Sequence, residues 1–503
     1  MPLSASHRKS FAPLANQLAL HGHSVELVSV ALDGPAAKGS LYKEHLLGFD
    51  PSESRLPLAD DFLHFNGSGL RDLFWASANS EVFLGTLPPW LIFSYASSLA
   101  IRKHGPLIHR LADQHWDFLI IDEFFNSLGF ALASKIDAPH AMAPTQAVYM
   151  EEAYWAGIPH NPALIPPVFI HHFFDYREFG SRFWSTWSDL MTILLWKYPL
   201  NWIMHYFAAE IFSNNRPTYQ DFIQSAVFHL SDLPSEVEVV RAVNRQFVAG
   251  GSYCTATHNS SLPEHYRAFM EDPASKGTIL VAFGSWVRWS LAPDAVRLSF
   301  YRALETFRDY RIIWQYDGPP LPLQPAHILA GPWHPQPTIL AHPSTRLYIT
   351  HGGLKSVRES LCLGKPMLAL PFFAEQRRNA FLLQARGLGL FLDKMDLLQS
   401  QVAASIQRVL GDARFEQEAR KVQGFLGDQL MSGERLGAWA VEAAMRRDRR
   451  EFAFNAAAVQ PFYQAFYLDW LALAYQMAYL TWAVIHRISY PQLYRHSSTK
   501  SRL

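Results

Sequence analysis

The sequence is poor in charge and in cysteine. Of its 503 residues, only 17% are Asp, Glu, Lys or Arg, against about 25% in a typical soluble protein. The 44 basic residues balance 44 acidic ones, and the formal net charge is +0. This balance argues against a general nucleic-acid-binding protein, which carries a basic excess, and against a disordered acidic protein. Two cysteines are too few for the disulfide framework of a small secreted scaffold or for a structural zinc site.

The N-terminus lacks the pattern of a secretory signal. Such a signal needs an uninterrupted apolar run and a small-residue cleavage site. Pro13, Asn16 and Gln17 interrupt the only candidate run in the first twenty residues, and no cleavage site follows it. We therefore expect no signal peptide in this chain.

Aromatic side chains take the place of the missing charge, with 15 Trp and 35 Phe. Residues 462–485 contain one charged side chain, Asp469, with tyrosine and tryptophan near both ends. This pattern predicts a transmembrane helix over 462–486 and a short tail over 487–503, and an amphipathic helix buried against the protein is the alternative. Arginines flank the segment on both sides, so charge does not settle its topology.

A second aromatic stretch, residues 183–212, is interrupted by Pro199. The proline predicts two short helices, one on either side of it. They are interpreted either as core helices of the first domain or as an apolar, membrane-contacting wall beside a substrate cleft.

Short apolar runs alternate with helical stretches in two parts of the chain. This alternation predicts an α/β protein with parallel sheets, whose ligands bind at the carboxyl ends of the strands. We expect an α/β domain over 1–235, a linker over 236–275 and a second α/β domain over 276–450. The clearest expected strands are residues 25–30, 118–121, 278–283, 311–316, 346–350 and 366–370.

The densest motif begins where the expected strand 346–350 ends. His351 and two glycines follow this strand, and a helix is expected to begin near Ser356. The glycines let backbone N–H groups approach an anion, and the start of a helix presents further N–H groups and the positive end of its dipole. This arrangement suits a diphosphate, to which His351 and Ser356 can also donate hydrogen bonds.

Residues around this turn offer further contacts, to a ribose, a base and a sugar. Glu359 lies one helical turn on and can accept hydrogens from a ribose diol, and Trp333 offers a flat face to a base. Glu375 and Gln376 follow the next expected strand, and a carboxylate beside an amide suits sugar hydroxyls. Each residue alone has a commoner explanation, since such a Trp is usually core and such a Glu is usually a solvated helix charge.

The order of these residues is more specific than any one of them. The pattern W-x-P-Q, x5, H-P, x7, H-G-G-x2-S-x2-E, x4, G-x-P, x8, E-Q-x2-N spans residues 333–379. It resembles the signature of the UDP-glycosyltransferases, inverting enzymes of the GT-B fold with two Rossmann-like α/β domains that face each other across a cleft. The resemblance implies these contacts with the donor: Trp333 on uracil; Gln336 and Glu359 on the ribose or uridine; His351, Gly353 and Ser356 on the diphosphate; Glu375 and Gln376 on the sugar hydroxyls; Asn379 near the phosphates; and Ser285 near the donor.

The N-terminal half is similar to the same family. Ser6-His7 is followed by Gly22-His23 at the family's spacing. The resemblance implies that His7 is the general base for the acceptor hydroxyl and that Asp122 orients it. A neutral imidazole beside a carboxylate is poised near pH 7 for this task. Glu123 is the rival to Asp122, and the apolar alternation of the strand favours Asp122 only mildly.

The resemblance assigns acceptor binding to the first domain and UDP-sugar binding to the second. It implies transfer of glucuronic acid or glucose to a hydroxyl of a small lipophilic acceptor, at the endoplasmic reticulum membrane, with a C-terminal anchor. No metal cluster is seen and no cofactor is expected, because the UDP-sugar is a co-substrate. The sequence leaves open the donor sugar, the acceptor and the oligomeric state, a homo-oligomer included.

The chain departs from the family in two respects. Family members carry a signal peptide and a complete first strand before the Ser-His pair, whereas six residues precede His7. We therefore expect a truncated or differently chosen start. Glu375 stands where aspartate is commoner, and its longer side chain could alter which sugar is accepted.

Three alternatives compete with transfer to a small lipophilic acceptor. The first is a lipid or sterol glucosyltransferase, and the second is a catalytically inactive homologue that binds UDP-sugar. A nicotinamide oxidoreductase is weaker, because Gly387-Leu388-Gly389 lacks the third glycine of the dinucleotide fingerprint.

Overall fold

The protein is described by a computed structural model, which divides into two compact units, residues 1–454 and 455–503. The structure describes residues 5–31, 40–48, 74–75, 87–122, 126–136, 138–143, 150–158, 161, 163–167, 174–208, 218–231, 247–248, 250, 254, 262–446, 461–465 and 467–498. Within the first unit, we call the described residues up to 250 the first α/β region and residues 262–427 the second α/β region.

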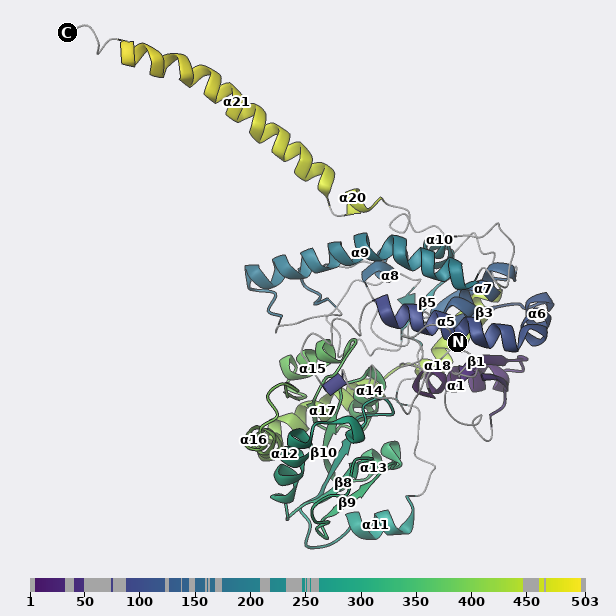
Figure 1. The fold of residues 1–503 in the computed structure, drawn as a ribbon. Coiled ribbons are helices and arrows are strands. Elements are labelled where there is room, and N and C mark those ends of the chain that lie inside the picture. Colours follow the sequence, from purple (N-terminus) through teal and green to yellow (C-terminus); the bar gives the residue numbers. More distant parts are fainter. Residues whose placement is uncertain are drawn as a thin grey trace. The chain divides into compact units, whose positions relative to one another are not determined.

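The second α/β region is built on one continuous parallel sheet of six strands, in the order β12-β11-β10-β7-β8-β9 (Figure 1). The strands are β7 (Thr278–Ala282), β8 (Arg311–Gln315), β9 (Ile328–Gly331), β10 (Thr345–Thr350), β11 (Met367–Ala369) and β12 (Gly389–Phe391). Its helices are α11 (Glu264–Met270), α12 (Asp294–Glu305), α13 (Gln336–Ala341), α14 (Leu354–Cys362), α15 (Gln376–Ala385), α16 (Gln399–Gly411) and α17 (Ala413–Gly427). The apolar runs expected as strands are buried because helices cover both faces of such a sheet.

The order of these strands reverses between β7 and β10, which are neighbours in the sheet but are separated by β8 and β9 in the chain. Ligands of open α/β sheets bind at such switch points, beyond the carboxyl ends of the strands. Thr350 at the end of β10 lies opposite Ala282 at the end of β7. The segments that follow these two strands therefore start side by side.

The first α/β region contains two separate parallel sheets, β1-β2 and β3-β4-β5-β6. Their strands are β1 (Glu26–Ala31), β2 (Lys43–Gly48), β3 (Leu119–Asp122), β4 (His140–Ala143), β5 (His229–Leu230) and β6 (Phe247–Val248). The helices are α1 (Ala5–Leu20), α5 (Leu87–Lys103), α6 (Gly105–Asp113), α7 (Ser127–Lys135), α8 (Met150–Trp155), α9 (Phe179–Ala208) and α10 (Tyr219–Gln224). The α/β class and parallel sheets expected from the sequence are confirmed.

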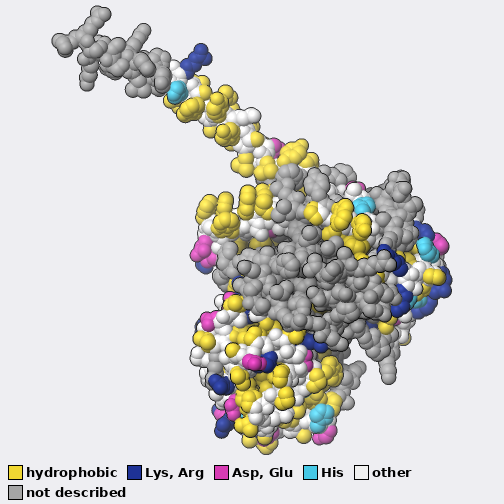
Figure 2. Space-filling model, in the orientation of Figure 1, with side chains coloured by type: hydrophobic (Ala, Val, Ile, Leu, Met, Phe, Trp, Pro, Cys, Tyr) yellow, Lys and Arg dark blue, Asp and Glu magenta, His cyan; other side chains and the backbone are white. Residues whose placement is uncertain are grey.

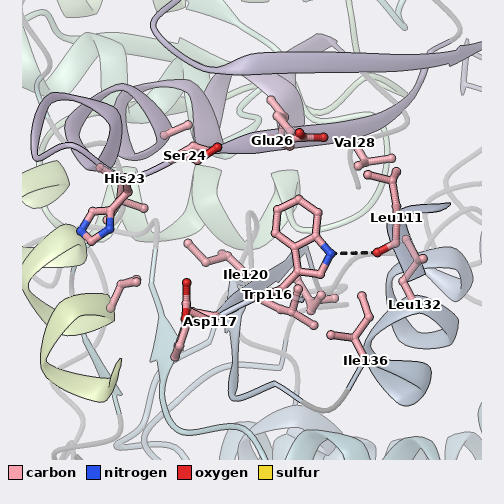
Figure 3. Close-up of a pocket in the computed structure, with 18 of the residues that line it drawn as sticks. His23, Ser24, Glu26, Val28, Leu111, Trp116, Asp117, Ile120, Leu132 and Ile136 are labelled. Atoms are coloured by element: carbon pink, nitrogen blue, oxygen red, sulfur yellow. Dashed lines mark hydrogen bonds between the residues drawn. The ribbon is translucent and has the colours of Figure 1, made fainter. Parts of the chain in front are cut away.

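A cavity of about 490 Å³ lies between β1 and β3. Val28 of β1, Ile120 of β3 and Leu132 of α7 point into it, and His23 and Asp117 also line it (Figure 3). Among the described residues, β1 pairs only with β2 and β3 pairs only with β4. The cavity therefore separates two strand edges that a single continuous sheet would join.

Helix α9 corrects the expectation of two short helices around Pro199. It is one helix from Phe179 to Ala208, with the proline inside. Proline removes one helical hydrogen bond, but α5, α7, α8 and α10 all pack along α9 and hold it together. The helix buries Ser181, Ser185 and Asp189 and exposes aromatic rings, which form a row of hydrophobic side chains along α9 in Figure 2.

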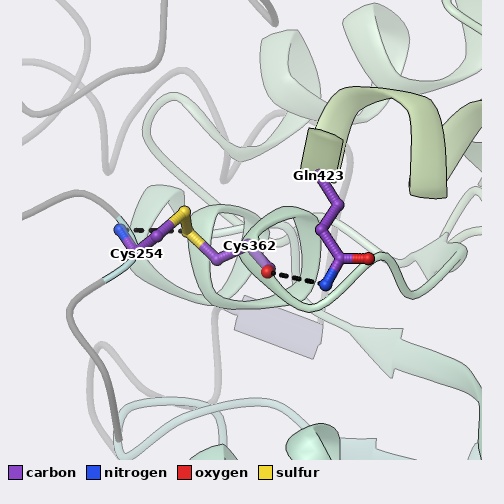
Figure 4. The surroundings of a disulfide bond; sticks show 3 residues. All are labelled: Cys254, Cys362 and Gln423. Carbon is purple, nitrogen blue, oxygen red and sulfur yellow. Dashed lines mark hydrogen bonds between the residues drawn. A yellow bond between two sulfur atoms is a disulfide. The ribbon is translucent and has the colours of Figure 1, made fainter. Parts of the chain in front are cut away.

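Two long-range connections join distant parts of the first unit. Helix α18 (Gly433–Met445) packs against α1, so a segment assigned to the second domain by sequence returns to the first α/β region. Cys254 and Cys362 form a disulfide bond, which ties the segment before α11 to the end of α14 (Figure 4). Gln423 of α17 donates a 3.2 Å hydrogen bond to the carbonyl of Cys362.

The second unit contains α20 (Phe462–Ala465) and α21 (Leu468–Ser498). Helix α21 continues well beyond residue 486, through much of the expected tail. Among the helices that the structure describes, none is both long enough and apolar enough to cross a membrane. The membrane span over 462–486 remains a prediction, as do the domain boundaries.

Candidate active site

The expected diphosphate turn lies at the switch point of the six-stranded sheet. His351, Gly352 and Gly353 follow β10, and α14 begins at Leu354, two residues earlier than expected. Gly352 has a φ of +83°, and a Cβ there would lie 3.1 Å from the carbonyl oxygen of Gln376, so both conformation and space favour glycine. Gly353 is the N-cap residue of α14, and no side chain there accepts a hydrogen bond from the first N–H groups of the helix. The start of α14 therefore presents an anion-binding helix end, although the N–H of Leu354 itself donates to Glu375.

His351 fits between two glycine turns. A Cβ on Gly353 would lie 2.5 Å from its Nε2, and a Cβ on Gly284, after β7, would lie 3.3 Å from its Cε1. Burial lowers the pKa of His351 to about 4, so the ring is neutral at pH 7. Its Nδ1 is buried and has no hydrogen-bond partner among the described residues. A neutral ring of this kind can donate one hydrogen bond to a phosphate oxygen.

The three residues expected near the ribose and diphosphate come together. Gln336, the first residue of α13, donates from Nε2 to Oε2 of Glu359 over 2.7 Å. The same Nε2 lies 3.4 Å from Oγ of Ser356. The side chain of Trp333, three residues before Gln336, is 70% exposed. Its ring is therefore not part of the core, and its faces are accessible to a base.

The two residues expected at the sugar also hold the backbone around them. Glu375 is 4% exposed, its Oε1 accepts a 3.3 Å hydrogen bond from the N–H of Leu354, and burial raises the pKa of its carboxyl group. Oε1 of Gln376 accepts hydrogen bonds from the N–H groups of Phe372 (2.9 Å) and Phe373 (3.2 Å). A sugar hydroxyl would therefore meet the second oxygen of Glu375 and the amide nitrogen of Gln376.

Asn379 and Ser285, the two remaining residues expected near the donor, differ in burial. Asn379 of α15 is buried and donates from Nδ2 to the carbonyl of Gly352 over 2.9 Å, so it supports the phosphate turn from behind. Ser285 is exposed after β7.

Sequence reasoning missed Gln315, whose Nε2 donates to the carbonyl oxygens of Gly284 (3.2 Å) and Pro332 (3.5 Å). Its only sequence signal is a polar residue at the carboxyl end of β8.

The expected catalytic pair is described in part. Asp122 is the last residue of β3 and is 1% exposed. Asn126 links the end of β3 to the start of α7, since its Nδ2 donates to the Asp122 carbonyl (2.9 Å) and its Oδ1 accepts from the N–H of Gly129 (2.7 Å). His7 lies in the first turn of α1. Its side chain and Glu123 lie outside the described part of the chain, so the pairing of His7 with Asp122 remains a prediction.

Comparisons with known proteins find related glycosyltransferases. A UDP-glycosyltransferase UGT5 of Dactylopius coccus is 26% identical over 76% of this chain and 73% of its own length. The human UDP-glucuronosyltransferase 1A8 is 24% identical over 96% of this chain and 89% of its own length. Among solved structures, the spinosyn forosaminyltransferase SpnP superimposes with a TM-score of 0.55 at 17% identity, over 88% of this chain and 97% of that one.

The structural likeness supports the GT-B fold, and the sequence relationship goes further. The profile of the UDP-glucuronosyl and UDP-glucosyl transferase family matches residues 94–500, which is most of the chain. The chain therefore belongs to the UDP-glucuronosyl and UDP-glucosyl transferase family, and it is a UDP-glycosyltransferase.

Proposed function

We propose that this enzyme transfers glucuronic acid or glucose from a UDP-sugar to a hydroxyl group of a small lipophilic acceptor, with inversion at the anomeric carbon. The observation that carries the proposal is the cluster at the switch point. The helix end at Leu354, the neutral His351 and the Gln336–Glu359 pair lie there together. This set matches a diphosphate flanked by a ribose.

In the proposed mechanism, the donor lies across the start of α14. The ring of Trp333 stacks on the uracil, and Glu359 accepts hydrogens from the ribose hydroxyls. The N–H groups of the first turn of α14 and the ring of His351 stabilise the negative charge that develops on the departing UDP. Binding through dipoles explains how a chain with no net charge can hold an anionic donor.

The acceptor hydroxyl is activated by the first α/β region. His7 takes its proton as the oxygen attacks the face of the sugar opposite UDP, and the buried Asp122 stabilises the imidazolium that forms. We base the lipophilic character of the acceptor on the aromatic content of this region and on relatives that are named glucuronosyltransferases.

The test is a transfer assay on the purified full-length protein. UDP-glucose and UDP-glucuronic acid are offered separately with a panel of phenols and steroids, and products are identified by mass spectrometry. We expect one donor to raise the acceptor mass by one hexosyl or one hexuronosyl residue, and NMR should show a β-configured product from the α-linked donor. Binding of UDP-sugar without any product would indicate an inactive homologue, and products only with long-chain lipids or sterols would indicate a lipid or sterol glucosyltransferase.

We further propose that the second unit attaches the enzyme to the endoplasmic reticulum membrane. Support comes from the large apolar side chains exposed on α21, among them Leu471, Trp482 and Ile485. Liposome flotation of the full chain and of a chain ending at residue 454 tests this attachment. Equal flotation of both proteins would contradict it.

A further inference from the structure

Two residues that come early in the chain, Phe74 and Trp75, are buried in the second α/β region beside the expected sugar site. Their side chains are 3% and 6% exposed. We call these two residues the Phe74-Trp75 anchor. It comes from the half of the chain expected to bind the acceptor, yet its described contacts are with residues 288–394.

Aromatic contacts place the anchor against two loops. The ring of Phe74 stacks on Phe373, with ring centroids 4.6 Å apart and an interplanar angle of 21°. Trp75 meets Phe372 edge-on at 4.7 Å and lies 5.3 Å from the ring of Trp289. Phe372 and Phe373 follow β11, and Trp289 follows β7. The anchor therefore touches two of the loops that carry expected donor-binding residues, Glu375 and Gln376 after β11 and Ser285 after β7.

Besides its buried aromatic contacts, the anchor is held in position by hydrogen bonds. Nε1 of Trp75 donates to the carbonyl of Arg288 over 3.0 Å. Nζ of Lys394, itself buried, donates to the carbonyl of Phe74 over 3.0 Å and to that of Phe372 over 3.4 Å. One ammonium group thus joins the anchor to the loop that it covers. Such paired, buried bonds specify one arrangement where apolar contact alone would allow several.

The loop beneath the anchor is strained. Ala374 follows Phe373 directly and has a φ of +53°, in the left-handed region that non-glycine residues rarely adopt. A residue keeps such a conformation only when its surroundings hold it there. On one side, Phe373 is held by the anchor. On the other side, Gln376 accepts hydrogen bonds from the N–H groups of Phe372 and Phe373.

We propose that Phe74 and Trp75 are positioning residues for the donor sugar. By packing on Phe372 and Phe373, they hold the Ala374 turn in the conformation that aims Glu375 and Gln376 at the sugar hydroxyls. The proposal rests on the proposed function, since it uses the sugar-binding role of Glu375 and Gln376. It adds that the sugar site of the second α/β region is complete only when the anchor from the other half is in place.

The test separates the sugar from the nucleotide, because the anchor touches the turn at residues 372–376 and has no described contact with Trp333, Gln336 or Glu359. Full-length Phe74→Leu and Trp75→Leu variants are assayed for the KM of the UDP-sugar and for inhibition by UDP. We expect the KM to rise about 10-fold, as for the loss of one good contact, and the inhibition constant of UDP to change less than about 2-fold.

Three further variants exclude simple loss of stability. Trp155→Phe removes another fully buried tryptophan, whose Nε1 has no hydrogen-bond partner among the described residues, and it should change neither constant. Trp75→Phe should restore part of the lost affinity, because a ring remains against Phe372. Phe74→Leu combined with Ala374→Gly should recover part of it too, because glycine adopts a positive φ without strain.

The outcomes distinguish this inference from the proposed function. Equal changes in the KM of the UDP-sugar and in UDP inhibition, or unchanged constants with only a lower melting temperature, would overturn the anchor proposal. If the wild-type enzyme transfers no sugar, the proposed function fails. In that case, calorimetry of wild-type and Phe74→Leu protein with UDP-glucose and with UDP tests the anchor proposal. A loss of affinity for UDP-glucose that exceeds the loss for UDP supports the proposal, and an equal loss for both ligands overturns it.

Discussion

The two α/β regions of this enzyme differ in the continuity of their sheets. In the second region, six strands form one parallel sheet, and the expected donor site lies at its switch point. In the first region, the strands form two sheets separated by a cavity of about 490 Å³. A continuous sheet positions side chains through its own hydrogen bonds, whereas a divided sheet relies on the helices packed around it.

This difference fits the proposed division between donor binding and catalysis. The residues expected to bind the donor hydrogen-bond to one another and to the turns around them, as in the Gln336–Glu359 and Asn379–Gly352 pairs. Such bonds within one region preorganise a site for a fixed ligand. The first region contributes Asp122 from a short strand at the edge of its sheet. We infer that nucleotide binding and catalysis can be disrupted independently.

The largest effect should come from the proposed catalytic pair of the first region, His7 and Asp122. We expect His7→Ala and Asp122→Asn to reduce kcat by at least about 100-fold, because each removes part of the general base. The affinity for UDP, measured by calorimetry, should remain nearly unchanged. Full activity in both variants would show that the base lies elsewhere, and a parallel loss of UDP affinity would contradict the division between the regions.

The opposite pattern is expected from the second region. Trp333→Ala should weaken UDP binding by roughly 10-fold or more, since stacking on a base contributes about 1–3 kcal/mol. Trp333→Phe should retain most of this affinity. Trp439→Ala, which removes an exposed tryptophan of α18, is the matched control and should leave UDP binding unchanged. A similar loss in the control would indicate a general effect on folding.

The two sheets should also respond differently to truncation of an isoleucine. Ile349 of β10 is fully buried, and Ile349→Ala should lower the free energy of unfolding by about 2–5 kcal/mol. Ile120 of β3 borders the cavity and is only partly buried, so its side chain makes fewer packing contacts and Ile120→Ala should cost about 1 kcal/mol. Denaturant unfolding measures both values, and equal losses would argue that the cavity is filled in solution.

The smallest effect concerns pH. A histidine with its usual pKa near 6.5 would gain charge between pH 8 and pH 6 and would then attract a diphosphate more strongly. Burial lowers the pKa of His351 to about 4, so the ring stays neutral over this whole range. We expect the calorimetric affinity for UDP-glucose to vary less than about 2-fold from pH 8 to pH 6. A clear rise towards pH 6 that disappears in His351→Gln would contradict this assignment.

Much of the second region was predictable from local sequence. The expected strands over 278–283 and 346–350 correspond to β7 and β10 within one residue, because fully buried strands are marked by continuous apolar runs. The turn at His351 was predictable for a similar reason, since glycines and a helix start leave a compact signal. The sequence predicted that Gln336 and Glu359 bind the same part of the donor. The structure adds a direct hydrogen bond between them.

Other features had no local signal. Pro199 predicted a break in α9, but helices packed along it hold it continuous. Nothing around Phe74 distinguishes it from other aromatic residues, although its partner Phe373 lies almost 300 residues away. The second task of Gln376, accepting two backbone hydrogen bonds, depends on how the turn at Ala374 folds.

The sequence by itself determined the α/β class and the family, and it predicted the donor-binding residues, because these depend on short apolar runs and on one compact motif. Tertiary structure alone decided the division of the first sheet, the cavity between its parts, the return of α18 to α1 and the burial of the Phe74-Trp75 anchor beside the sugar turn. These features arise from contacts between residues far apart in the chain. Such contacts depend on the packing of whole elements, which no local pattern records.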